Sequence, residues 1–112
     1  MKHTLKRNKE YGFLYRRGKS SVSSALVMYY YKNRRGSNRY GITAGKKVGN
    51  AVKRNRARRV IREAYYRLCG QIKPGYDFVF VARGKTPYVK CAEVQRQMYN
   101  QLKKENLLAP LA

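Results

Sequence analysis

Acidic residues are scarce in this sequence, and their scarcity argues against several kinds of catalysis. Only five of the 112 residues are acidic, and no two of them lie within one helical turn along the chain: Glu10, Glu63, Asp77, Glu93 and Glu105. Metal-dependent nucleases need clustered carboxylates, because divalent cations such as Mg²⁺ prefer oxygen ligands. We therefore expect no catalytic carboxylate cluster, and an arginine is the expected partner of these acids.

Histidine and cysteine are as rare as the acids. The one histidine, His3, stands in an N-terminal segment that we expect to be frayed, so a Ser-His-Asp set has no support. The two cysteines, Cys69 and Cys91, have no CxxC spacing and cannot complete a four-ligand zinc site with a single histidine. We expect two reduced, partly buried thiols and no metal held by protein side chains alone.

Long apolar runs are missing as well. No stretch approaches the roughly 18 apolar residues of a transmembrane span. The N-terminal MKHTLKRNKEYG is basic and lacks the apolar core of a signal peptide. These absences predict a cytoplasmic protein with no membrane partner.

Lysine and arginine, by contrast, are abundant. They number 27 and give the chain a net charge of +22. Self-repulsion of that size opposes folding, so the surplus indicates a polyanionic partner, with nucleic acid ahead of an anionic membrane surface. Eleven tyrosines and three phenylalanines, with many Val, Ile and Leu residues, still supply apolar surface for a core. We predict a single RNA-binding domain over residues 1–112, ordered from about residue 8 to residue 107.

A first helix is predicted over residues 9–17. Asn8 can cap its start, Gly18 can end it, and Tyr11 and Tyr15 fall on one of its faces. The later elements are an edge strand over 20–24, strands over 25–32 and 39–44, a central helix over 51–68, a buried strand over 76–82 and a last helix over 90–107.

The turn over 34–38 joins two of these strands, so we expect residues 25–32 and 39–44 to form an antiparallel hairpin. The element order is α-β-β-β-α-β-α. It indicates an α+β sandwich with one small mixed sheet covered by helices.

The central helix is the most informative stretch of the chain. From Lys46 to Arg67 there are nine bases and one acid, Glu63. At about 100° per residue its apolar side chains form one stripe: Ala57, Val60, Ile61, Ala64 and Leu68. Arg54 and Tyr65 fall on the flank of that stripe. The side chains opposite the stripe are those of Asn55, Arg58, Arg59, Arg62 and Tyr66. The helix is thus predicted to pack one side and to offer a basic side outward.

Binding to RNA is the function that this pattern favours. Arginine forks match phosphate geometry, and bases stack on aromatic faces with about 1–3 kcal/mol each. An arginine-rich helix can also be a merely solvated face, and single tyrosines are more often core residues than ligands. The other candidates are a general RNA-binding or ribosomal protein, a duplex-DNA binder and, last, a membrane-surface peptide.

The same residues resemble a known family. The stretch KKVGNAVKRNRARRVIRE over 46–63 is similar to the signature of the bacterial ribonuclease P protein subunit, with a basic pair, Gly-Asn-Ala-Val, Arg-Asn-Arg and a second basic pair. Weaker likenesses flank it in NKEYGFLYRRG over 8–18, YGITAGKK over 40–47 and FVFVAR over 78–83. The resemblance covers about residues 8–100.

This resemblance implies a fold and a role. The fold is a four-stranded mixed sheet with a left-handed β-α-β crossover, like the second domain of ribosomal protein S5. The role is that of an accessory subunit without catalytic residues of its own. A large catalytic RNA performs the magnesium-dependent cleavage that removes the 5′ leader of precursor tRNA. Mg²⁺ is then held mainly by the RNA and the substrate, and no obligate protein partner is implied.

The resemblance also implies two sets of site residues. One set contacts the catalytic RNA: Lys46, Lys47, Asn50, Arg54, Asn55, Arg56, Arg58, Arg59 and Arg62. The other set lines a central cleft for the leader: Tyr11, Tyr15 and Tyr29. The family often has phenylalanine at the first two cleft positions, and tyrosine keeps the stacking face while adding a hydroxyl group.

Overall fold

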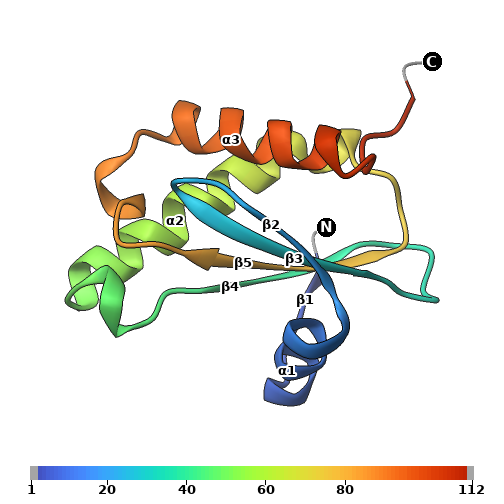
Figure 1. Cartoon of the computed structure of the whole chain (residues 1–112), viewed down its shortest axis with the longest axis horizontal. Coiled ribbons are helices and arrows are strands. Elements are labelled where there is room, and N and C mark those ends of the chain that lie inside the picture. Colours follow the sequence, from blue (N-terminus) through green and yellow to red (C-terminus); the bar gives the residue numbers. More distant parts are fainter. Residues whose placement is uncertain (1–2, 111–112) are drawn as a thin grey trace.

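Three helices cover the two faces of one mixed β-sheet in the computed structural model of the chain, which describes residues 3–110. Helices α2 and α3 lie on one face and α1 lies on the other (Figure 1). The elements in chain order are β1 (His3–Thr4), α1 (Asn8–Arg17), β2 (Lys19–Val22), β3 (Leu26–Lys32), β4 (Arg39–Thr43), α2 (Ala51–Leu68), β5 (Tyr76–Ala82) and α3 (Cys91–Lys104). Three 3₁₀ turns connect them: η1 (Lys46–Val48), η2 (Cys69–Gln71) and η3 (Thr86–Tyr88).

The strands run in the spatial order β1-β4-β5-β3-β2. The central strand β5 is antiparallel to β3 and parallel to β4, and α2 makes the crossover between the parallel pair. The predicted α+β sandwich with a small mixed sheet is therefore confirmed. The two-residue β1 adds a short edge strand, parallel to β4, that the sequence did not reveal.

The predicted hairpin between residues 25–32 and 39–44 is wrong. Strand β5 lies between β3 and β4 and pairs with both. It suits the central place because it is apolar on both faces, with Phe78 and Phe80 on one and Val79 on the other, all fully buried. The connecting turn is bonded to the start of β5 instead: Asn38 accepts from the backbone N–H of Tyr76 at 2.8 Å and donates to the Lys73 carbonyl at 3.1 Å.

The main core lies between the sheet and helices α2 and α3. Alternate residues of β3, Leu26, Met28 and Tyr30, face it, as the strand period predicts. The apolar stripe of α2 is buried there too, with Val60 half-buried. Tyr65, which the helical angle placed on the flank, is also a core residue: it is 2% exposed and its ring stacks on Tyr40, with centroids 4.5 Å apart.

Regular structure begins nearer the N-terminus than predicted, at β1 and not at about residue 8. His3 belongs to β1 rather than to a frayed end, and Leu5 is buried and donates its backbone N–H to the Tyr40 carbonyl at 2.8 Å. Asn8 is the first residue of α1 and not its cap. The carboxylate of Glu10 takes that role, accepting from the backbone N–H groups of Lys6 and Arg7 at 3.1 and 3.0 Å.

Candidate nucleic-acid interface

The basic segment begins in the loop that connects β4 to α2. Lys46 and Lys47 lie exposed in η1, followed by Gly49 with a φ of +140°. A Cβ at Gly49 would stand 2.7 Å from Cδ of Lys53, so the turn requires glycine. Asn50 then caps α2, because its Oδ1 accepts the backbone N–H of Lys53 at 3.0 Å. Asn50, predicted as an RNA contact, therefore also has a structural role.

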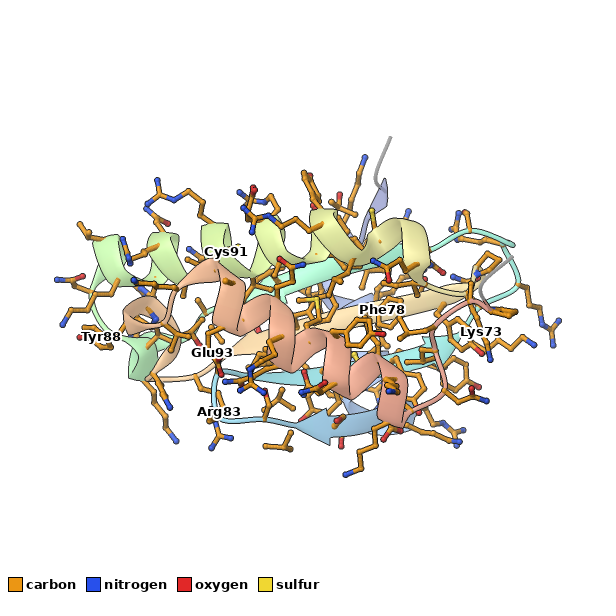
Figure 2. The ribbon with its side chains drawn as sticks, turned by 90° about the horizontal axis from the view of Figure 1, so that it is seen from above. Lys73, Phe78, Arg83, Tyr88, Cys91 and Glu93 are labelled. Atoms are coloured by element: carbon orange, nitrogen blue, oxygen red, sulfur yellow. The ribbon has the colours of Figure 1, made fainter. Side chains whose placement is uncertain are left out.

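Helix α2 turns its charged side away from the core. Asn55, Arg56, Arg59 and Arg62 are exposed, and Arg54 and Arg58 are half-buried, whereas Ala57, Ile61, Ala64 and Leu68 are buried. Figure 2 shows side chains tipped with nitrogen projecting from α2 on the side away from α3. The structure thus brings all nine residues of the predicted RNA-contact set onto η1, α2 and the Asn50 cap before it, at least partly open to solvent.

Two members of this set are held by contacts within the chain. The Nε of Arg56 donates to the Pro87 carbonyl at 2.6 Å and so ties η3 to α2. Nη1 of Arg58 donates to Oδ1 of Asn55 at 3.0 Å, which orients both side chains on the outer surface. Within residues 3–110, none of the seven lysines and arginines in the set forms an ion pair with an acid.

The acids are engaged elsewhere, as the sequence predicted for most of them. Glu63 pairs with Arg67 at 3.3 Å, Glu93 pairs with Arg96, and Arg39 bridges Glu10 and Asp77. Only Glu105 has a different partner among the described residues, the hydroxyl group of Tyr30 at 2.6 Å. Among the described residues, Arg67 is consequently the only base of α2 with an acid partner, and the other positive charges of the helix are left unpaired by acids.

A second candidate surface is a cleft beside α1. It has a volume of about 560 Å³, and its wall includes Asn8, Tyr11, Gly12 and Tyr15, which share one side of α1. Leu5, Lys6 and Thr43 complete the lining. Sequence reasoning placed only the two tyrosines here. Asn8 and Gly12 follow from the same helical spacing, but Lys6 and Thr43 come from other segments and gave no signal.

The three predicted cleft tyrosines have different positions. Tyr15 lines the cleft, with its hydroxyl group 3.5 Å from Oγ1 of Thr43, and its ring packs edge-on against Tyr29, with centroids 5.0 Å apart. Tyr29 is half-buried on β3 and supports Tyr15 without lining the cleft. Tyr11 lies directly over Gly41, and burial raises the pKa of its hydroxyl group, which donates to the Leu5 carbonyl at 3.4 Å.

Comparison with known proteins finds a matching protein family. The family model described as Ribonuclease P matches residues 1–106. The chain belongs to the ribonuclease P protein family. A relative named ribonuclease P protein component, from Pelotomaculum thermopropionicum, is 43% identical over 103 residues, which cover 92% of each chain. A second, from Oceanobacillus iheyensis, is 37% identical over 95% of this chain and 88% of its own.

Solved structures of ribonuclease P proteins share the fold. The Staphylococcus aureus protein superposes with a TM-score of 0.84 at 27% identity, over 97% of this chain and all of its own. The Thermotoga maritima protein gives a TM-score of 0.81 at 29% identity, over 92% and 97% of the two chains. The likeness therefore extends over nearly the whole domain.

In this member of the ribonuclease P family, two of the acids share one arginine as their partner. Arg39 donates through Nε and Nη2 to Asp77 at 3.0 and 2.7 Å, and through Nη1 to Glu10 at 2.7 Å. Burial alone would raise the pKa of Glu10, but the N–H groups of Arg7 and Lys6 and the guanidinium of Arg39 outweigh it and lower that pKa. Among residues 3–110 no three His, Cys, Asp or Glu side chains form a group suited to a metal ion.

Two further findings concern the expected class of protein. Cys69 and Cys91 are both free and half-buried. No helix within residues 3–110 combines the length and apolarity that crossing a bilayer requires.

Proposed function

We propose that this chain is the protein subunit of a ribonuclease P holoenzyme, in which an RNA subunit removes the 5′ leader of precursor tRNA. Membership of the family supports the assignment. The single observation that carries it is the outer side of η1 and α2, where seven lysines and arginines face solvent without an acid partner among the described residues. A polyanion supplies the missing counter-charge.

In this proposal the basic side of α2 grips the catalytic RNA. Arginine guanidinium groups bind phosphate oxygens in pairs, and each contact releases counterions from the RNA. Arg58, which Asn55 orients at 3.0 Å, is positioned for such a contact without a large loss of side-chain freedom. The amide group of Asn55 adds neutral hydrogen bonds at the same surface.

The cleft beside α1 receives unpaired nucleotides of the leader. Tyr11 and Tyr15 offer aromatic surface, and Lys6 offers a positive charge for the backbone. Tyr29 holds the ring of Tyr15 through their edge-on contact, so its role is to position the stacking residue. The bond breaking and the Mg²⁺ it requires belong to the RNA and the substrate, and we place the process in the cytoplasm.

The decisive experiment is cleavage of precursor tRNA by the separated and recombined components. Protein without RNA should cleave nothing, and protein added to its RNA subunit at low Mg²⁺ should increase cleavage. Metal-dependent cleavage by the RNA-free protein, lost when its acids are changed to amides, would overturn the proposal.

Leader dependence separates this function from that of a general RNA-binding or ribosomal protein. The holoenzyme should bind precursor tRNA more tightly than mature tRNA, and Tyr15→Leu should reduce that difference. Equal binding of substrates with and without a leader would contradict the role of the cleft and favour the general RNA-binding alternative.

A further inference from the structure

We propose that a second site for unpaired RNA lies on the other side of α1, around the aromatic pair Phe13–Tyr31. The two rings meet edge-on with centroids 5.0 Å apart and planes at 88°. They form part of an open groove of about 520 Å³ that shares no lining residue with the cleft of Tyr11 and Tyr15. The groove goes beyond the proposed function, because neither the family likeness nor the leader-binding role assigns it.

The groove and the cleft lie at opposite ends of strand β4. The cleft reaches Thr43, which ends β4, whereas the groove reaches Arg39, which begins it. Helix α1 lies against this face of the sheet, opposite α2 and α3 (Figure 1), and contributes Phe13 and Arg16 to the groove. One helix therefore borders two separate openings.

The aromatic pair is more exposed than packing alone requires. Phe13 is 40% exposed and Tyr31 is 42% exposed, whereas Leu14, the next residue of α1, and Tyr30, the residue before Tyr31 on β3, are both buried. Exposed aromatic surface on a chain this rich in lysine and arginine is the combination that unpaired bases use, because every base has a face that can stack.

The charges around the pair fit a phosphate backbone. Five bases and two acids line the groove, which gives it a net charge of +3: Lys9, Arg16, Lys32, Arg34, Arg39, Glu10 and Asp77. Arg39 already bonds both acids, so the groove carries no unpaired carboxylate toward a ligand. Within residues 3–110, the other four bases form no ion pair with an acid. They are free to hold phosphates beside a base stacked on Phe13 or Tyr31.

The site should accept one or two unpaired nucleotides with little preference for the base. The structure offers stacking surface and point charges, and stacking with charge contacts gives binding that tolerates different sequences. An acidic peptide would satisfy the charges but would gain little from the two exposed rings. The combination of ring surface and cations therefore favours RNA over protein as the occupant.

The test uses the reconstituted holoenzyme with its cleft occupied by a leader-bearing, uncleavable precursor tRNA. A decamer of uridine carrying 4-thiouridine is added, irradiated, and the crosslinked residues are mapped by mass spectrometry. We expect crosslinks at Phe13 or Tyr31 that persist when the leader is present. Crosslinks that appear only at Tyr11 and Tyr15, and that the leader removes, would overturn the second site and leave the cleft assignment intact.

Matched variants give an independent readout with the full-length protein. Phe13→Leu and Tyr31→Leu together keep apolar bulk but remove the rings, and should weaken decamer binding to the groove about tenfold while leaving leader discrimination unchanged. Tyr15→Leu is the control and should do the reverse. Arg34→Gln, an exposed change that leaves the rings in place, should flatten the salt dependence of decamer binding by about one unit. Displacement of the decamer by equimolar poly-glutamate, or full affinity in the double variant, would contradict base stacking.

Discussion

The contact between Tyr11 and Gly41 allows a strict test of the cleft. A Cβ at residue 41 would lie 2.3 Å from Oη of Tyr11 and 2.6 Å from two of its ring carbons. Ordinary contacts begin near 3.4 Å, so Gly41→Ala should push the ring about 1 Å out of its place. The ring edge as well as the hydroxyl group is in the way, and the hydroxyl is also bonded to the Leu5 carbonyl. A rotation of the O–H bond therefore cannot relieve the clash.

Two magnitudes follow from this displacement. Overpacking of a well-packed site typically costs about 1–3 kcal/mol of folding stability, which a thermal or urea melt of the free protein measures. If Tyr11 stacks a base of the leader, the same change should weaken binding of leader-bearing precursor tRNA by about 1–3 kcal/mol. Binding of the holoenzyme to mature tRNA, and of the protein to its RNA subunit, should be unchanged because α2 is not involved.

The chain offers a close control and a rescue. Gly45→Ala lies four residues further on, has a φ of −79°, and its Cβ would meet nothing within 4 Å, so it should leave stability and leader binding alone. Gly41→Ala combined with Tyr11→Leu should recover part of the lost stability but not the leader affinity. Wild-type stability and wild-type leader binding in Gly41→Ala would refute the placement of Tyr11 in the cleft wall.

Three other outcomes are expected. Arg58→Ala and Arg62→Ala should each weaken binding to the RNA subunit and flatten the log–log salt dependence of that binding by about one unit. Arg67→Ala should not, because Arg67 is already paired with Glu63. Equal salt slopes for all three variants would show that these arginines merely face water. Glu10 has a lowered pKa when folded, so its stabilisation is present above the ordinary value of 4.5 and is lost as pH falls through the folded pKa. Glu10→Gln should therefore lower the melting temperature at pH 7 and weaken its dependence on pH below about 4.5; parallel wild-type and variant curves would contradict this linkage. Tyr29→Ala removes the ring pair with Tyr15 and should lower the free energy of unfolding by about 0.5–1.5 kcal/mol. It should also lower the affinity for the leader, while the circular dichroism spectrum stays native. Unchanged leader binding would contradict the positioning role of Tyr29.

Local pattern was sufficient for the helix that carries the basic surface. The apolar stripe and the arginines of α2 repeat with the helical period, and both fall where that period puts them. The strand over 76–82 was likewise predicted with its observed bounds, Tyr76–Ala82. An apolar run between two turns is a local signal, which does not depend on the segments that later pack against it.

Pairing between distant segments could not be predicted in this way. The sheet order depends on β5 entering between β3 and β4, which no local pattern in those two strands encodes. Tyr65 is buried because Tyr40 stacks on it from another element, so its helical angle alone was misleading. The cleft shows the same division: the tyrosines of α1 could be inferred, while Lys6 and Thr43 join them only through the tertiary fold.

Buried amides in α3 illustrate a further limit. Gln97 and Gln101 carry polar amide groups, yet both side chains are buried. Oε1 of Gln97 accepts the backbone N–H of Ala25 at 2.8 Å, and Nε2 of Gln101 donates to the Ser21 carbonyl at 2.8 Å. These bonds satisfy backbone groups near the β2–β3 connection, a need that becomes visible only once strand and helix are in contact.

The bridge that Arg39 makes between Glu10 and Asp77 has a mechanical consequence. It fastens α1 to the sheet with two of the five acids in the chain, in the wall of the groove around Phe13 and Tyr31. Because other residues of α1 line the cleft of Tyr11 and Tyr15, loss of this bridge would loosen the helix at both openings. A single guanidinium on the sheet thus helps to hold the helix that contributes side chains to both openings.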